Sequence, residues 1–276
     1  MSKGTPYGDW SYDGSELFRG RVPSSIAHSH GRLASLRHNT TNAHEGEDLN
    51  HPSTVQAMPL VLKMPRSALP PRRDLLEATA LASILVCLDP RAGYDETWMT
   101  PLAQWYGARI RKIARRARTP GQWASVQDIP GMTVTIGESS ARAFLPGPVR
   151  DIDPRIGKLQ ISGTDLPPHD DQQNIGASIK ESVYPVIAIN TDLEMSVGKA
   201  AAQVGHAAML WAAHATYSTV EQWLREPRFT VVESSSHDLD DAVRRRGAGQ
   251  SVEIIDAGFT EVMPGSRTAV VFNPAL

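Results

Sequence analysis

Residues 185–214 read PVIAINTDLEMSVGKAAAQVGHAAMLWAAH, and this stretch decides the fold. Val186, Ile187 and Ala188 form a short apolar run that is typical of a buried strand. From Lys199 onward the pattern favours a helix, and its many alanines allow close packing on a sheet. The stretch therefore predicts a strand that leads almost directly into a long helix.

The same pattern occurs earlier in the chain. A shift of 126 residues places residues 59–62 on residues 185–188, and it places Arg73 on Lys199. Each block then continues in the order strand, helix, helix, strand, helix, strand, strand, which indicates an α/β unit with a small mixed sheet. We interpret the likeness as a tandem duplication, and a generic α/β pattern shared by two unrelated blocks is the alternative.

The composition divides the chain into four parts. Residues 1–57 are polar, without a sustained apolar period, and are expected to form a disordered or irregular arm. Residues 151–181 contain prolines and paired acids, and are expected to be a linker. The two structured blocks are residues 58–150 and 182–276. The fold class is α/β, with two tandem three-layer units that each hold a four-stranded mixed sheet.

The near-neutral charge of the chain conceals an uneven distribution. The 276 residues carry 28 Lys and Arg against 30 Asp and Glu, which taken alone argues against an obligate nucleic-acid binder. Residues 60–150 carry 13 basic against 7 acidic residues, whereas residues 181–276 carry 7 against 12. An RNA substrate is therefore compatible with the composition, and the basic block would hold it.

Further features restrict the class of protein. The single cysteine, Cys87, excludes an internal disulfide framework. The longest apolar run, residues 80–88, is shorter than the roughly 20 residues of a membrane span. The polar beginning of the chain lacks the apolar core of a signal peptide. We expect a cytoplasmic protein that does not bind membranes.

Two stretches of the second block carry candidate chemistry. On the predicted helix, Lys199, Gln203 and His206 are spaced so that a cation, an amide and an imidazole share one face. The alternative interpretation is that Lys199 is only a solvated lysine and that His206 is only a buried core histidine. The second stretch, IIDAGFTEVMPGSRT at residues 254–268, places Asp256 between an apolar strand and a turn. Taken alone, this second stretch could serve only to form turns.

Together the two stretches closely resemble the type 2 peptidyl-tRNA hydrolase family. The resemblance covers residues 184–276. The matching residues are Asp192, Leu193, Met195, Gly198, Lys199, Ala201, Ala202, Gln203, His206, Ala207, Asp256, Ala257, Gly258, Thr260, Gly265, Ser266 and Thr268. The chain departs from the family at Asn190, where many members have arginine, and at Gly205, where serine is usual.

The resemblance implies a function, a site and a mode of assembly. It implies hydrolysis of the ester that joins a peptide to the terminal ribose of tRNA, without a metal or another cofactor, in proteins that usually form dimers. The implied catalytic residues are Lys199, Gln203, His206, Asp256, Thr260 and Thr268. The chemistry agrees, because a carboxylate can activate water and a lysine can stabilise an oxyanion.

The first block lacks this set and is expected to be inactive. Arg73, Glu77 and Ala80 stand where the second block has lysine, glutamine and histidine. Because members of the family pair, we expect the two blocks to form an intramolecular pseudo-dimer within a possibly monomeric chain. Residues 109–118 hold six cations that could contact tRNA phosphates, although such a run is often only a solvated surface. The expected substrate-binding residues are Arg111, Arg115, Arg116, Asp192, Ser266 and Arg267.

Two other functions fit the same sequence. One is transfer of the acyl group from charged tRNA to a small amine, which could use Asp256 and Lys199 in the same way. The other is binding of RNA without catalysis, which the complete catalytic set disfavours. Incubation with a labelled N-acylated aminoacyl-tRNA, with and without amine acceptors, would distinguish the three.

Overall fold

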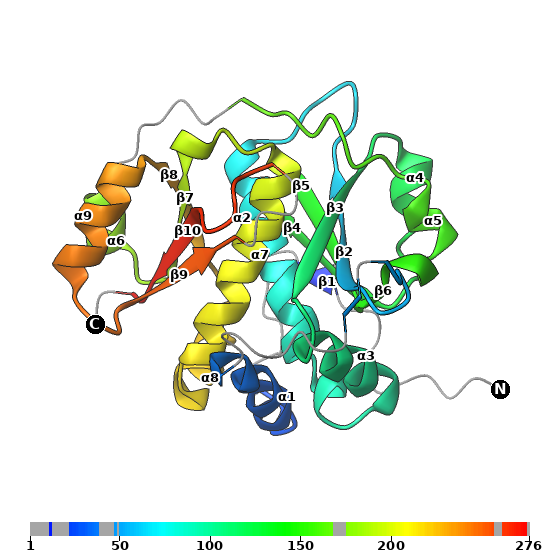
Figure 1. Cartoon of the computed structure of the whole chain (residues 1–276), viewed down its shortest axis with the longest axis horizontal. Coiled ribbons are helices and arrows are strands. Elements are labelled where there is room, and N and C mark those ends of the chain that lie inside the picture. The colour runs from blue at the N-terminus through cyan, green and yellow to red at the C-terminus, as the bar shows by residue number, and fades with distance from the viewer. Residues whose placement is uncertain are drawn as a thin grey trace.

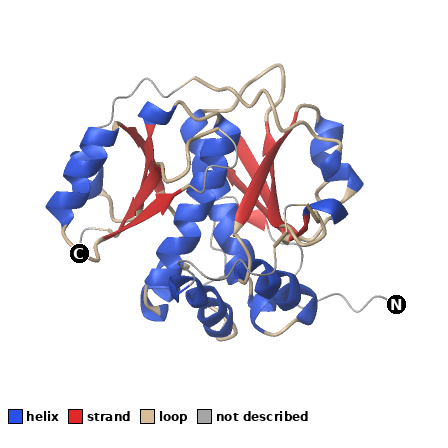
Figure 2. Ribbon diagram, viewed as in Figure 1, coloured by secondary structure: helices blue, strands red, loops and turns tan. Residues whose placement is uncertain are grey.

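Two sheets lie on either side of a central pair of long helices (Figures 1 and 2). The structure is a computed structural model, and it describes residues 11–12, 22–38, 47–48, 50–167, 175–256 and 261–274. The central helices are α2 (Arg72–Leu88) from the first half and α7 (Val197–His214) from the second half. They pack against each other, so the cores of the two halves form one continuous apolar cluster.

The strands and helices follow the predicted order in both halves. In the first half they are β2 (Gln56–Lys63), α2, α3 (Glu96–Tyr106), β3 (Arg111–Ala117), α4 (Pro120–Ala124), β4 (Gly131–Ile136) and β5 (Ser139–Phe144). In the second half they are β7 (Val186–Asn190), α7, α8 (Tyr217–Trp223), β8 (Thr230–Ser234), α9 (Ser236–Arg246), β9 (Ser251–Ile255) and β10 (Arg267–Phe272). This correspondence confirms that both halves are α/β units with mixed sheets.

The two sheets share one topology. The second sheet has the order β9-β10-β7-β8, and the first contains the matching path β4-β5-β2-β3. In each sheet the strand before the central helix is parallel to one neighbour and antiparallel to the other. The first sheet is larger than the expected four strands, because the two-residue strands β1 (Ser11–Tyr12) and β6 (Gly147–Pro148) pair with β4 and β2.

Close packing of α2 on α7 depends on small residues. Gly205 of α7 faces Ser83 of α2, and a Cβ atom at position 205 would lie 2.5 Å from the Ser83 hydroxyl oxygen. Most alanines of α7 are also buried, including Ala200, Ala201 and Ala208. Side chains of this size let two helix backbones approach closely, and the sheets then cover the outer sides of the pair.

The expected linker contributes helices to the outer layers. The short helix α5 (Pro154–Gly157) lies on the outer face of the first sheet, where Ile156 is buried. The helix α6 (Ile175–Glu181) packs with α9 on the outer face of the second sheet. Both are short segments with few apolar residues, so the composition of 151–181 concealed them.

The expected irregular arm is wrong at residues 26–38. The helix α1 (Ile26–Leu33) and the 3-10 helix Ala34–His38 lie against α2 and α7 (Figure 1). Ile26 and Leu33 are buried, and the His30 Nε2 atom lies 2.9 Å from the Ala212 carbonyl oxygen. Spacing by four and three residues places these side chains on one helix face, but the polar residues around them masked the pattern. None of the described helices is long and apolar enough to cross a membrane.

Candidate active site

A lysine, a carboxylate and an amide meet where the first turns of α7 face the end of β9. Lys199 Nζ donates to Asp256 Oδ2 at 2.5 Å, and Gln203 Nε2 donates to the same oxygen at 2.7 Å. All three side chains are largely buried. Lys199 and Gln203 lie one turn apart on α7, so the predicted helical face is confirmed, and Asp256 follows β9 directly.

Thr268 fixes the orientation of the amide. Its hydroxyl donates to Gln203 Oε1 at 2.8 Å, so the NH2 group of Gln203 points to Asp256. Thr268 is fully buried on β10, the strand beside β9. The hydrogen bonds therefore run from Thr268 through Gln203 to the carboxylate, which holds the carboxylate in one position.

The backbone around Asp256 is held by the turn that leads into β10. Asp256 N–H donates to the Ser266 carbonyl at 2.9 Å, and Gly265 N–H donates to the Asp256 carbonyl at 2.8 Å. Gly265 has a φ of 82°, a conformation that glycine adopts without strain. Ser266, a predicted substrate-binding residue, thus contributes its backbone to the position of Asp256. Thr260, the remaining predicted catalytic residue, lies outside the described residues.

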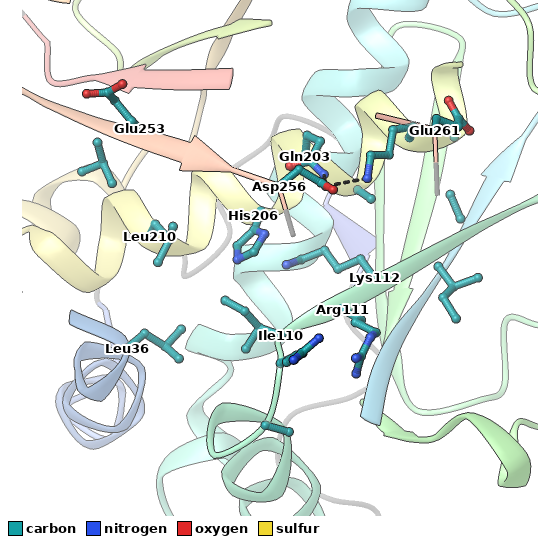
Figure 3. A pocket seen from close by; sticks show the side chains of 18 of the residues that line it. Leu36, Ile110, Arg111, Lys112, Gln203, His206, Leu210, Glu253, Asp256 and Glu261 are labelled. Carbon is teal, nitrogen blue, oxygen red and sulfur yellow. Dashed lines mark hydrogen bonds and ion pairs between the residues drawn. The ribbon is translucent and has the colours of Figure 1, made fainter. Parts of the chain in front are cut away.

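The cluster forms part of the wall of a cavity of about 880 Å³ between the two halves (Figure 3). Lys199, Gln203 and His206 line it from α7, and Glu253 and Asp256 line it from β9 and its end. The opposite wall is residues 108–114 of the first half, at and before β3. The cavity is thus built by both blocks, which no motif in the sequence indicated.

His206 lies in the cavity wall one turn beyond Gln203. Burial, and then the positive charges of Lys112 and Lys199, hold the pKa of its imidazole well below its ordinary value. The imidazole is therefore neutral at neutral pH, and it can accept or donate a hydrogen bond but carries no charge.

The beginning of α7 is fixed by three polar contacts. Ser196 caps the helix and accepts from Lys199 N–H at 3.2 Å. Its own N–H and hydroxyl donate to the carboxylate of Glu261 at 2.9 and 2.7 Å. The Thr164 hydroxyl accepts from Gly198 N–H at 3.0 Å, and this threonine comes from the segment expected to be a linker. These contacts fix the turn that carries Lys199.

Three of the predicted substrate-binding residues have structural contacts elsewhere. Asp192 accepts from Ser236 N–H at 2.9 Å, which lowers the pKa of the Asp192 carboxyl and caps the start of α9. Arg115 donates to the carbonyls of Gly157 and Leu159, at 3.2 and 2.8 Å. Arg116 donates to the Gln160 side chain at 2.5 Å and to the Gly163 carbonyl. The two arginines thereby attach residues 157–163 to β3.

The other predicted cations form ion pairs. Arg267 pairs with Glu253 at 3.0 Å and also with Asp240. Arg111 lies in the cavity wall and pairs with Glu47 at 2.6 Å. Of the six predicted substrate-binding residues, the structure therefore brings only Arg111 to the cavity lining.

Among the cavity residues that sequence reasoning missed are Glu261 and Lys112. Glu261 was part of the quoted motif, and its place one residue after Thr260 was the available signal. Lys112 lies within the basic run, but the alternation of buried and exposed positions in β3 is too weak to separate it from its neighbours. Among the described residues, no group of three histidine, cysteine or acidic side chains is arranged to hold a metal ion.

This arrangement has a definite chemistry. A carboxylate fixed by a lysine and an amide can orient and deprotonate a water molecule, and the cation beside it can stabilise negative charge. The fold and site together define an α/β protein with an acid–base centre suited to hydrolysis of an acyl bond.

Comparisons with known proteins agree with this class. A family profile described as Peptidyl-tRNA hydrolase PTH2 matches residues 183–276. A protein named peptidyl-tRNA hydrolase from Pyrobaculum aerophilum is 38% identical over 103 residues, which cover 34% of this chain and 85% of that protein. One of the same name from Methanocaldococcus jannaschii is 40% identical over 96 residues, covering 32% of this chain and 84% of that protein. The comparison with solved structures gave no significant match. The chain belongs to the type 2 peptidyl-tRNA hydrolase family.

Proposed function

We propose that the second half hydrolyses the ester between a peptide, or an N-acyl amino acid, and the 3′ ribose of tRNA. The observation that carries the proposal is the Asp256 carboxylate, held by Lys199 and Gln203 at the wall of the cavity. The family of the chain and the names of its relatives point to the same substrate. Because this substrate belongs to translation, we also propose that the protein acts in the cytoplasm.

In the proposed reaction Asp256 takes a proton from water as that water attacks the ester carbonyl. The carbon–oxygen bond to the ribose then breaks, and the peptide leaves with a new carboxylate while the ribose hydroxyl regains a proton. The ammonium of Lys199, 2.5 Å from the carboxylate, stands close enough to stabilise the negative oxygen that develops on the carbonyl. Gln203, oriented by Thr268, keeps the carboxylate in place throughout.

A covalent route through the single cysteine does not fit the structure. Cys87 is fully buried in α2, and burial raises the pKa of its thiol to about 11. A thiol with so high a pKa holds almost no thiolate at neutral pH, and thiolate is the nucleophile. Direct attack by water, assisted by Asp256, is the route that this site supports.

We propose that the two halves, residues 58–150 and 182–276, form an intramolecular pseudo-dimer. The support is reciprocal: α7 of the second half contacts β3 of the first, and α2 of the first contacts β8 of the second. Because α2 corresponds to α7 and β3 corresponds to β8, each half contributes the same helix to one contact and the same strand to the other. An interface with two-fold symmetry has this property. The shared strand order of the two sheets gives the same support.

The replacement Asp256→Asn tests the proposed reaction. Asparagine keeps the shape of the side chain but cannot accept a proton from water, so kcat/KM for N-acetyl-aminoacyl-tRNA should fall about 10²–10⁴-fold. Release of the labelled N-acetyl amino acid is the measurement, run with and without an added amine acceptor. Asp151→Asn, an exposed acid outside the cavity lining, is the matched control and should leave the rate unchanged.

Three results would count against the proposal. The first is an Asp256→Asn protein that keeps its melting temperature and hydrolyses at the normal rate. The second is wild-type protein that transfers the acyl group to the amine rather than to water. The third is wild-type protein that binds the substrate without releasing any product.

A further inference from the structure

The wall of the cavity that faces α7 comes from the half without the catalytic set. Ile110, Arg111, Lys112 and Ala114 belong to this wall, and the β3 strand that carries most of them also contacts α7. A substrate that reaches Asp256 therefore lies against β3 as well. Any polar group that β3 directs into the cavity becomes part of the binding site.

Lys112 lines this wall, and its amine lies buried behind it without the hydrogen-bond partner that a buried cation needs. Its Nζ atom is buried and has no hydrogen-bond partner among the described residues. It lies 5.0 Å from the centre of the Trp105 ring, a contact that favours a cation but supplies no negative charge. Burial lowers the pKa of this amine to about 7. The neighbouring Arg111 differs, since it pairs with Glu47.

Figure 3 shows the direction of the Lys112 side chain, which extends from β3 toward His206. The positive charges of Lys112 and Lys199 both act on the His206 imidazole. Two amines thus influence one neutral imidazole, and of these the amine of Lys199 is paired with Asp256. An anion bound beside His206 would give Lys112 the partner that it lacks.

We propose that Lys112 binds the phosphodiester group that precedes the acylated nucleoside at the 3′ end of tRNA. The proposal rests on the proposed function, because it takes the ester to lie at Asp256. His206 lies one turn of α7, about 5 Å, beyond Gln203, and Lys112 acts on His206, so its amine serves the part of the cavity that follows the cluster along the helix. The 5′-phosphate of a nucleoside lies on the far side of the ribose from its acylated 3′ oxygen, which matches this displacement.

The amine can adapt to such a ligand. Lysine carries its charge on a flexible four-carbon stem, so the amine can move from the face of Trp105 toward a bound phosphate. A phosphate also favours the charged form of the amine, which burial disfavours in the free protein. The half of the chain without the catalytic residues therefore takes part in the reaction as a substrate-binding wall.

The test compares adenosine with adenosine 5′-monophosphate as ligands of the full chain. These probes differ only in the phosphate, so the ratio of their Kd values, measured by calorimetry or NMR titration, isolates its contribution. We expect wild-type protein to bind the monophosphate about tenfold more tightly, as is typical of a charge-assisted contact. In Lys112→Met, which keeps the length of the side chain, the ratio should fall below about twofold.

Two further measurements separate binding from structure. The melting temperature of Lys112→Met should equal or exceed that of wild type, because the replacement removes an unpaired buried amine. With N-acetyl-aminoacyl-tRNA, KM should rise about tenfold and kcat should change little, as expected for a contact made in ground and transition states alike. Lys158→Met is the matched control, since Lys158 is exposed and lies outside the cavity lining.

The outcomes distinguish this proposal from the proposed function. Wild-type protein that shows less than a twofold preference for the monophosphate, or no binding of it, overturns the role of Lys112 even if hydrolysis occurs. The same conclusion follows if Lys112→Met weakens binding of N-acetylphenylalanine, whose carboxylate represents the released product, but not of the monophosphate. Failure of wild-type protein to hydrolyse peptidyl-tRNA, with the monophosphate preference intact, would instead overturn the reaction.

Discussion

Single residues of the first half have structural roles at the positions that match the proposed catalytic residues of the second half. Glu77, the counterpart of Gln203 in the repeat, accepts a hydrogen bond from Val231 N–H of β8 at 3.0 Å. Arg72, at the start of the same helix, pairs with Glu233 of β8 at 2.8 Å across the two halves. The face of α2 that corresponds to the proposed catalytic face of α7 therefore holds the second half in place through Glu77, and Arg72 assists it from the start of the helix.

Glu77 makes the stability of the protein depend on pH. Burial is the main reason that the pKa of its carboxyl is raised to about 7, against 4.5 ordinarily. Between these values the folded state binds the proton and the unfolded state releases it, so the free energy of unfolding falls as pH rises. The destabilisation is small below pH 4.5 and reaches its full value above pH 7.

Glu77→Gln should therefore stabilise the protein at alkaline pH, because the amide keeps the oxygen that accepts from Val231 without the buried charge. We expect the free energy of unfolding to rise by roughly 1–3 kcal/mol at pH 8.5, and by much less at pH 4.5. Urea unfolding at the two pH values measures it. Glu138→Gln, at an exposed acid in the turn between β4 and β5, is the control. If the gain in the free energy of unfolding is the same at both pH values, the raised pKa of Glu77 is contradicted.

At the scale of elements, the approach of α7 to α2 explains a departure from the family. Serine usually precedes the helix histidine in the family, and this chain has Gly205. The atom nearest to a Cβ at that position would be the Ser83 hydroxyl oxygen of α2, and the Lys112 stem would lie at 3.1 Å. A larger residue at position 205 thus conflicts with the first half, so packing against Ser83 and Lys112 excludes it.

Gly205→Ala should destabilise the protein by about 1–2 kcal/mol, although alanine is the better helix former by about 1 kcal/mol. The reason is the 2.5 Å approach of the added Cβ to the Ser83 oxygen. Adding Ser83→Ala removes that oxygen and should recover part of the loss. Chemical denaturation of the single and double variants gives the coupling energy. Strictly additive effects would show that the two helices are not in this contact.

The prediction of elements succeeded where the pattern was long and failed where it was short. The order of strands and helices in both halves followed from apolar runs and helical spacing, which are properties of local sequence. The helices α1, α5 and α6 were missed because each is short and contributes only a few buried residues, such as Ile26, Ile156 and Ile175. Their stability comes from surfaces supplied by distant segments, and no local pattern encodes those surfaces.

At the scale of the whole molecule, the shared core makes the two halves depend on each other. Residues of α2 and α7 belong to one apolar cluster, so neither half keeps a closed core without the other. The cavity also needs both halves, since the proposed catalytic side chains and β3 form opposite walls. The division into a basic and an acidic block thus places a basic strand across the cavity from the acid of the site.

We expect the full chain to be a monomer of about 30.1 kDa, because α2 already covers the face of α7 that a second copy would need. Sedimentation equilibrium over a wide range of protein concentrations measures the mass directly. A stable dimer of twice this mass would show that another surface mediates pairing. Such a dimer would also contradict the proposal that the pseudo-dimer of the two halves takes the place of pairing between two chains.

Local patterns were sufficient to predict the α/β order of both halves, the family, and the helix face that presents Lys199 and Gln203, because each follows from the spacing of residues along the chain. They also placed Asp256 at the end of a strand, and the structure brought these residues within hydrogen-bonding distance. The packing of distant segments determines that Lys112 lines the cavity while Arg115 and Arg116 anchor a neighbouring segment. All three are cations on one strand, and their roles depend on which distant residues lie beside them, which spacing along the strand does not specify.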